Sequence, residues 1–347
     1  MNTGAQTIEW LFGEQLKVDD EWAVRTPSGF RWWADRQAQT IEVIGEEASP
    51  EGETEYLVAV RTELVRSIDL DDRTLSVVNA HLMSLASMAG PVYDRDHRLL
   101  SLCSLVKVHD QISPWMNPLI SMAAVLQIGE ARIMAPAVAQ LLDAEVASSG
   151  HPQHGLRPDP DELAEVIAAL IAPTGREPSR WPVEEFRDVV DRYTKQPPAL
   201  LATAGDRGFT VEFPWADESS LCQVMADQAH PRYGNGLFVW QSFPVPSMSE
   251  GDGIRLALSM NEIELTQRPF GYGFGSYAFR NAGLHFTAFL PNAIYRPGLL
   301  PNIYFSSGQR ARELAVRFTG CEWTPESCDP RRSAIGRMMD QEEGPRS

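Results

Sequence analysis

Several features that would indicate a particular partner or compartment are missing from this sequence of 347 residues. No run of 18 or more apolar residues occurs, and residues 1–10 lack a basic stretch followed by an apolar run. We therefore expect neither a membrane span nor a signal peptide. Positive charge is scarce, with 30 Lys and Arg against 47 Asp and Glu, and the net charge of −17 would repel nucleic acid and anionic membranes. A cytoplasmic protein with neither of these partners is predicted.

Cysteine is scarce as well. The four cysteines, Cys103, Cys222, Cys321 and Cys328, have no spacing typical of metal ligands. Two of them lie in apolar, strand-like runs, where a reduced thiol behaves as a small hydrophobic side chain. We interpret the cysteines as structural. A local disulfide between Cys321 and Cys328 is an alternative that a cytoplasmic location disfavours.

Catalytic and ligand-binding motifs are largely absent. The sequence has no Gly-x-Ser-x-Gly elbow and no His-Glu-x-x-His motif. Residues 271–275 alternate glycine with aromatic residues, but they lack the further glycine and the Lys-Ser or Lys-Thr pair of phosphate loops. The segment lies between a predicted helix and a predicted strand, and we interpret it as a flexible or bulged β-connection.

Histidine and aspartate pairs offer the remaining candidates for chemistry. His151 and His154 have a spacing that could serve a metal, but no third ligand is nearby, so we interpret them as solvated loop residues. Aspartates that cluster before a predicted helix, Asp69, Asp71 and Asp72, favour helix capping over paired acid–base catalysis. No catalytic residue, cofactor or metal site is predicted.

What the sequence does contain is an internal repeat, or echo, at an offset of about 182 residues. Gly29-Phe30 recurs as Gly208-Phe209, Trp33-Ala34-Asp35 as Trp215-Ala216-Asp217, Leu57 as Leu237, Arg73 as Arg255, Asn79 as Asn261 and Leu100 as Leu284. The matches keep their order, and loop insertions between equivalent elements would account for the small drift in offset. The echo predicts a duplicated domain. Chance matches in an apolar-rich sequence are the alternative.

Hydrophobic periodicity predicts the same order of elements in both halves. The first half is predicted to contain a helix at 7–17, strands within 22–31, 40–44 and 56–65, a helix at 75–89, a strand at 99–108, and a helix at 115–142 with a break or kink at Pro136. The second half is predicted to contain a helix at 183–193, strands within 200–213, 221–227 and 237–245, a helix at 254–265, a strand at 283–290 and a helix at 299–316.

This order indicates an α+β fold with two tandem domains. Each domain is expected to be an antiparallel meander sheet covered on one face by helices, and the two are expected to be related by pseudo-two-fold symmetry. The predicted boundaries are 1–146 for the first domain, 147–182 for a linker with a short helix at 161–171, 183–320 for the second domain, and 321–347 for a polar, disordered tail.

The aspartate-rich start of the helix that contains Asn79, the apolar strand at 99–108 and the helix that opens at Trp115 resemble the YbjN and type III secretion chaperone-like superfamily. The second half shows the same pattern with Asn261, residues 284–290 and residues 299–311. This resemblance implies small α+β domains that commonly pair as homodimers and bind other polypeptides without turning over a substrate. A chain with two copies would be a monomeric pseudo-dimer or a homodimer.

We therefore expect a non-enzymatic protein-binding module, chaperone-like or a regulatory adaptor, that presents a groove or sheet edge to a client polypeptide. The acidic composition would favour basic client segments. The candidate partner-binding residues are Trp32, Trp33, Trp215, Trp240 and Phe243, although aromatic residues in strands are more often part of the core. The alternative hypothesis is a small-molecule enzyme with a site in the cleft between the two domains.

Overall fold

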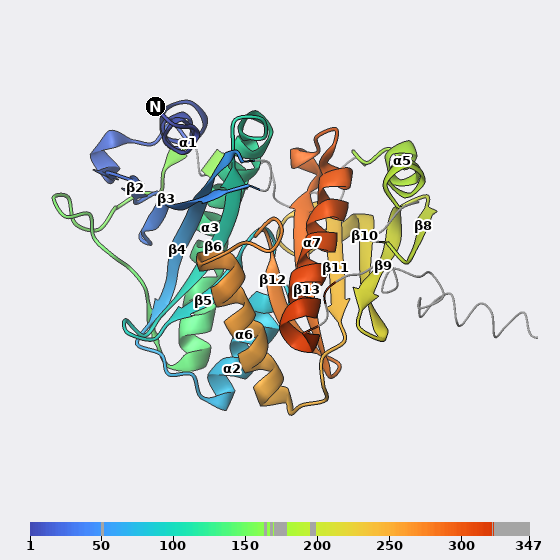
Figure 1. Cartoon of the computed structure of the whole chain (residues 1–347). Coiled ribbons are helices and arrows are strands. Elements are labelled where there is room, and N and C mark those ends of the chain that lie inside the picture. Colours follow the sequence, from blue (N-terminus) through green and yellow to red (C-terminus); the bar gives the residue numbers. More distant parts are fainter. Residues whose placement is uncertain are drawn as a thin grey trace, which may run out of the picture. The chain divides into compact units, whose positions relative to one another are not determined.

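The computed structural model describes residues 1–49, 52–162, 165, 166, 169, 179–194, 199–320 and 322 (Figure 1). Contacts within the chain divide it into two compact units. The first comprises Met1–Ala172 and Ile254–Tyr277, and the second comprises Pro173–Gly253 and Ala278–Ser347. Most of the helix predicted at 161–171, and nearly all of the tail with Cys321 and Cys328, lie outside the described residues.

An antiparallel sheet forms the centre of the first unit. Its strands are β1 (Ala23–Thr26), β2 (Gly29–Trp32), β3 (Gln39–Ala48), β4 (Thr54–Arg66), β5 (Gly90–Asp94) and β6 (Leu99–Val108), with the short β7 (Glu145–Val146) paired to β4. Their order in the sheet is β1-β2-β3-β4-β6-β5. The predicted meander therefore holds for four strands and then changes, because β6 pairs with β4 and leaves β5 at the edge.

The second unit contains a six-stranded antiparallel sheet. Its strands are β8 (Leu201–Gly205), β9 (Gly208–Trp215), β10 (Glu218–His230), β11 (Gly234–Phe243), β12 (Ser276–Arg280) and β13 (Gly283–Pro291). Read from β8, their order is β8-β9-β10-β11-β13-β12, which is the order of the first sheet. The predicted α+β class with antiparallel sheets is confirmed. Strands β5 and β12 were not predicted from the sequence.

In each half of the chain one helix precedes the strands, one lies between the fourth and fifth strands, and one follows the last long strand. They are α1 (Thr3–Trp10), which continues as a π-helical turn (Leu11–Gln15), α2 (Asp72–Val78), which continues likewise (Asn79–Met83), α3 (Ser113–Leu142), α5 (Val183–Tyr193), α6 (Glu250–Thr266) and α7 (Leu299–Thr319). The predicted helix at 75–89 therefore ends earlier, at Met83, before β5 begins. The helix predicted at 183–193 is confirmed at both ends.

In the first unit, α1 and α3 cover the same face of the sheet. Residues two apart on a strand share a face. On β4, Tyr56 lies against α1, where a Cβ atom on Gly4 would be 2.9 Å from the Tyr56 ring. Thr62 lies six residues further along β4 and so points to the same face as Tyr56. Its hydroxyl donates a hydrogen bond to Gln127 Oε1 of α3 at 3.0 Å.

The second unit repeats this arrangement on β9. Phe209 lies 6.4 Å, ring to ring, from Phe186 of α5, and Phe213 lies 5.8 Å from Tyr304 of α7. Phe209 and Phe213 are four residues apart and so share a face. Helices thus cover one face of the sheet in each unit.

Helix α3 is the one helix within the described residues that is long and apolar enough to cross a membrane. Its most apolar window is 61% buried, and it packs on β4 and β6, as Figure 1 shows. A buried core helix passes the same test of length and composition, so this helix is weak evidence for a membrane. Pro136 does not break α3. Because Pro136 lies on the exposed side, the carbonyl that loses its partner can bond to water.

A buried glutamine links the strands to the long final helix in both units. Gln39 Nε2 donates to Thr62 Oγ1 and to the Ala124 carbonyl of α3, both at 2.8 Å. Gln241 Nε2 donates to the Ser307 carbonyl of α7 at 3.0 Å. Because buried amides need such partners, each glutamine restricts where the helix can lie on its sheet.

Burial along β4 and β11 corrects one detail of the sequence echo. Val58, Val60, Thr62 and Leu64 alternate with more exposed residues in the way that Leu237, Val239, Gln241 and Phe243 do, an offset of 179. Leu57 therefore corresponds to Gly236 and not to Leu237. A shift of one residue would place the side chains on opposite faces of a strand.

The segment Ile254–Tyr277 belongs to the first unit, although the sequence interpretation placed it within the second domain. Leu265 of α6 joins a buried cluster with Val92 of β5 and Cys103 of β6. Gly273 exchanges backbone hydrogen bonds with Leu105 of β6, at 3.2 and 3.4 Å. These contacts link positions far apart in sequence, which local periodicity does not report.

The raised pKa values of the two described cysteine thiols predict that the protein loses stability at alkaline pH. Burial raises the pKa of Cys103 to about 12 and that of Cys222 to about 11, whereas an unfolded thiol ionises near pH 8.5. Above that pH the unfolded state binds fewer protons than the folded state. The free energy of unfolding should then fall by about 1.4 kcal/mol per pH unit for each thiol until its folded pKa is reached.

Urea unfolding followed by circular dichroism from neutral to alkaline pH would measure this slope. The double variant Cys103→Ala and Cys222→Ala is expected to flatten the profile. A double variant with an unchanged slope would assign the alkaline loss to other groups.

Candidate functional site

Four of the five aromatic residues predicted to bind a partner lie in the core. Trp32, Trp33, Trp215 and Phe243 are each at most 2% exposed. Trp215 and Phe243 lie 5.7 Å apart, ring to ring, in the second unit. Trp240 is half-buried and stacks on His285 at 5.1 Å. The structure therefore does not bring the five residues together on one surface.

His151 is buried against tryptophans, and His154 lies exposed beside it. Their rings stack at 4.9 Å, and His151 lies 5.0 Å from the Trp33 ring. The backbone N–H groups of Gln153 and His154 both point to His151 Nδ1. Within the described residues no group of three His, Cys, Asp or Glu side chains could hold a metal ion. The interpretation of solvated loop histidines is therefore wrong for the buried His151.

The aspartates around the start of α2 take structural roles. Asp71 is the N-cap and accepts from the Thr74 backbone N–H at 2.7 Å, and this hydrogen bond lowers the pKa of its carboxyl group. Asp69 pairs with Arg98 at 2.7 Å and Asp72 with Arg255 at 2.9 Å. Capping, as predicted, accounts for Asp71.

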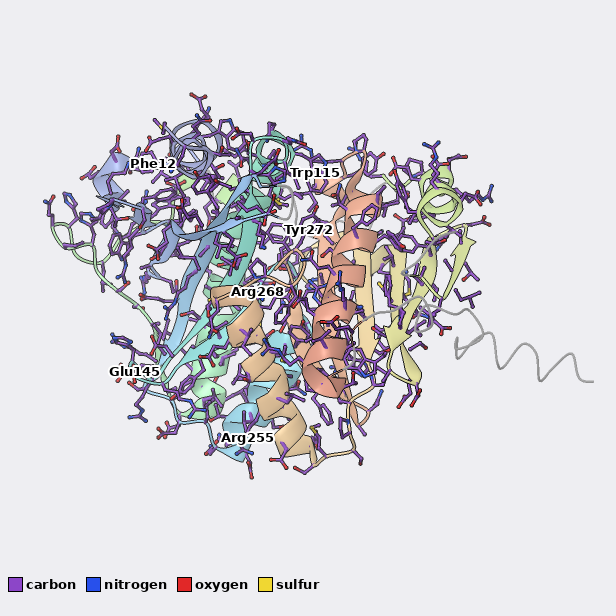
Figure 2. The ribbon with its side chains drawn as sticks, viewed as in Figure 1. Phe12, Trp115, Glu145, Arg255, Arg268 and Tyr272 are labelled. Atoms are coloured by element: carbon purple, nitrogen blue, oxygen red, sulfur yellow. The ribbon has the colours of Figure 1, made fainter. Side chains whose placement is uncertain are left out.

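The glycine-rich segment 271–275 lies against strand β6. A Cβ atom on Gly273 would be 2.2 Å from the Leu105 carbonyl oxygen, so only glycine allows the backbone hydrogen bonds between them. Tyr272 lies 6.0 Å, ring to ring, from Trp115 at the start of α3 (Figure 2). The segment extends the pairing of β6 beyond the end of β5, consistent with a β-connection.

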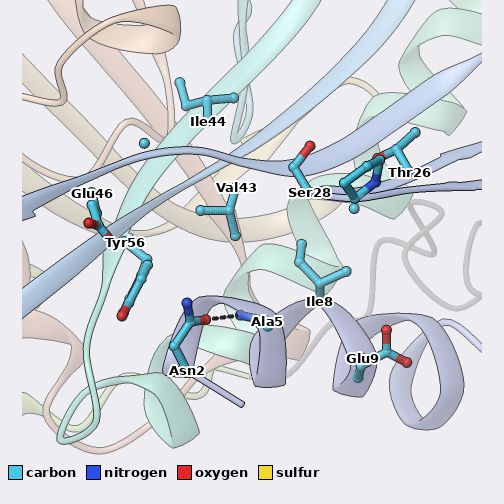
Figure 3. Close-up of a pocket in the computed structure, with 13 residues that line it drawn as sticks. Asn2, Ala5, Ile8, Glu9, Thr26, Ser28, Val43, Ile44, Glu46 and Tyr56 are labelled. Carbon is cyan, nitrogen blue, oxygen red and sulfur yellow. Dashed lines mark hydrogen bonds between the residues drawn. The ribbon is translucent and has the colours of Figure 1, made fainter.

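A groove between α1 and the outer part of the first sheet is the best candidate for a binding site. We name it the α1–β3 groove, and its volume is about 420 Å³. The residues that line it are Asn2, Ala5, Ile8, Glu9, Thr26, Pro27, Ser28, Gly29, Val43, Ile44, Gly45, Glu46 and Tyr56. Figure 3 shows Ile8 and Val43 pointing into the space between α1 and β3.

Strand β3 has a free edge at this groove. On one side it pairs with β4 over its whole length, to Ala48 opposite Thr54. On the other side β2 pairs with it only as far as Glu42, opposite Gly29, followed by a bond from the Val43 N–H to the Ser28 carbonyl. Among the described residues, no strand pairs with residues 44–48 on that side. Unpaired strand edges are sites where another chain can add as a strand.

The groove carries negative charge. Glu46 is exposed and has no ion-pair partner among the described residues, whereas Glu9 forms a two-pronged ion pair with Arg25, at 2.8 and 3.2 Å. No lysine, arginine or histidine is among the described residues that line the groove. The floor contributed by Ile8, Val43 and Tyr56 is largely apolar. Such a surface suits an extended segment that carries both apolar and basic side chains.

Sequence reasoning missed this site because the predicted strand stopped at Ile44. In the structure β3 continues through a bulge between Val43 and Gly45 to Ala48, six residues beyond its last partner in β2. The acidic pair Glu46-Glu47 after Gly45 was the available signal, since charged residues commonly protect strand edges.

Comparison with known proteins gives no further guide to this site. No protein-family model and no curated protein matches the chain.

Proposed function

We propose that this protein binds extended polypeptide segments without catalysing a reaction, and that the α1–β3 groove receives the segment. The free edge of β3 carries the proposal. An added strand would form main-chain hydrogen bonds to residues 44–48, while the groove accepts alternate side chains. Neither contribution requires a catalytic group.

Charge determines which segments are favoured. Glu46 has no ion-pair partner among the described residues, and no cationic residue is among those that line the groove. Together with the net charge of −17, this favours basic segments and speeds their encounter with the protein. Exposed charges of this kind are screened by salt.

The proposal keeps the chaperone-like role that the sequence resemblance implies, and it includes duplication of an ancestral domain. The same strand order in both sheets and the matching burial of β4 and β11 support duplication. Gly29 and Gly208 also support duplication, because a Cβ atom added at either position would lie 2.0 or 1.9 Å, respectively, from a carbonyl oxygen of the next strand. We extend the proposal to pseudo-two-fold symmetry and to a monomeric pseudo-dimer or a homodimer.

A labelled nonapeptide that alternates valine and lysine is expected to bind, and fluorescence anisotropy would measure its Kd. A peptide in which central valines are replaced by proline should bind much more weakly, because proline cannot donate main-chain hydrogen bonds. Replacing lysine by glutamate in the peptide should also weaken binding. If the proline peptide bound as well as the parent, the free edge would not be the binding site.

The variant Glu46→Lys is expected to weaken binding of the valine–lysine peptide roughly three- to tenfold. Glu218→Lys is the matched control, because Glu218 is also exposed at a strand position but lies in the second unit. Both variants change the net charge equally. Equal weakening by the two would indicate general attraction and not recognition at the groove, and no binding by any peptide would refute the proposed function.

A further inference from the structure

A tryptophan closes the N-terminal end of the helix layer in the second unit. Trp181 directly precedes Pro182, the N-cap of α5, and is only 5% exposed. Its Nε1–H donates to Asn292 Oδ1 at 2.6 Å, and its ring meets Tyr295 edge-to-face at 5.2 Å. Trp181 thus fills the space between the start of α5 and the connection from β13 to α7.

The first unit has the same connections without such a side chain. Met1 directly precedes Asn2, the N-cap of α1, and is 82% exposed. The Thr3 hydroxyl donates to the Asp110 carboxylate, joining α1 to the connection from β6 to α3. In the second unit the Tyr295 hydroxyl donates to the Glu185 carboxylate at the equivalent place. In both units a hydrogen bond to a carboxylate therefore joins the start of the helix to this connection, with the donor on the helix in the first unit and on the connection in the second.

At the start of α1, the element that precedes the first sheet as α5 precedes the second, the first unit has a pocket of about 620 Å³. We name it the N-terminal pocket. It lies between Met1 with the start of α1 (Asn2, Thr3 and Gln6) and residues from the segments 53–56 and 109–114. Asn2 and Tyr56 line both this pocket and the α1–β3 groove, so the two adjoin.

We propose that the N-terminal pocket binds the indole ring of a tryptophan in the client polypeptide, an inference that rests on the proposed function. The side chain of the client takes the place that Trp181 takes within the second unit. His109 is the first residue after β6, as Asn292 is the first after β13. His109 lines the pocket together with Glu53 and Asp110. The two carboxylates accept from Gln111 and Thr3 and keep further lone pairs that can accept the indole N–H.

Two probes test the inference. The first is N-acetyl-L-tryptophanamide, compared with N-acetyl-L-alaninamide by saturation-transfer NMR. The second is the valine–lysine nonapeptide carrying one terminal tryptophan, compared with the same peptide carrying alanine. Burial of a large apolar side chain predicts roughly tenfold tighter binding of the tryptophan peptide.

The variant Thr54→Trp blocks the pocket, because Thr54 is exposed and lines it. It should abolish saturation transfer to N-acetyl-L-tryptophanamide and remove the preference for the tryptophan peptide. Thr203→Trp, at an exposed position of β8 in the second unit, is the matched control and should change neither.

The outcomes separate the two proposals. If the valine–lysine peptide binds but tryptophan gives no advantage over alanine, the pocket inference is overturned and the proposed function stands. A preference for tryptophan that persists in Thr54→Trp also overturns it. If N-acetyl-L-tryptophanamide binds in a way that Thr54→Trp abolishes while no peptide binds, the pocket recognises indole and the proposed function fails.

Discussion

Replacing Gly208 by alanine is expected to lower the free energy of unfolding by roughly 3 kcal/mol. The backbone φ angle of Gly208 is 154°, a conformation that residues with a side chain rarely adopt. A Cβ atom there would lie 1.9 Å from the Val224 carbonyl oxygen on β10. Because that oxygen belongs to the backbone of the paired strand, the contact is relieved only by moving the strand.

Gly129→Ala is the matched control for this substitution. Gly129 lies inside α3, and a Cβ atom there would meet nothing within 4 Å. Alanine should therefore stabilise the helix by up to about 1 kcal/mol. Urea unfolding followed by circular dichroism would compare the two variants, and a Gly208→Ala protein as stable as the wild type would contradict the strand geometry.

Leu265→Ala is expected to destabilise the first unit by roughly 2–5 kcal/mol, the usual cost of a cavity in a packed core. Leu265 is almost fully buried against Val92 and Cys103, although it lies more than 160 residues from either in sequence. The resulting cavity should also make the Cys103 thiol reactive. Thiol labelling followed by mass spectrometry would show the modification at Cys103.

Leu314→Ala provides the comparison, because Leu314 is equally buried but lies on α7 in the second unit. It should lower stability by a similar amount while Cys103 stays as unreactive as in the wild type. If Leu265→Ala left Cys103 unreactive, the segment Ile254–Tyr277 would not form part of the core of the first unit.

The elements that were predicted well are those with clear local patterns. The strand at Leu99–Val108 and the helix at Val183–Tyr193 were predicted with their bounds. Strands β5 and β12 were missed, although the equally short β8 was covered by a predicted strand. β5 begins directly after the predicted helix at 75–89, and β12 begins directly after the glycine-rich segment 271–275.

The α1–β3 groove was not located from the sequence. An acidic surface with a sheet edge was expected, but the aromatic residues chosen for it are mostly buried. The groove exists because β3 has ten residues and β2 only four, so part of β3 has no partner on that side. A free edge arises where two paired strands differ in length. The sequence of either strand alone does not show which residues pair with the other strand.

Trp181 illustrates the same limit. An N-terminal helix signal at Pro182 can be read locally, but whether the preceding side chain folds into its unit depends on the connection after β13, more than 100 residues later. Met1 occupies the corresponding position before α1 and remains exposed.

The sequence by itself determined the α+β class, most of the strands and helices, the echo between the halves and the acidic charge, because periodicity, turn residues and composition act over short stretches of chain. Only the tertiary structure decided that Ile254–Tyr277 joins the first unit, that β3 keeps a free edge and that Trp32, Trp33 and Trp215 are core residues. These outcomes depend on which surfaces are buried against each other, and burial is a property of the packed chain and not of any one segment.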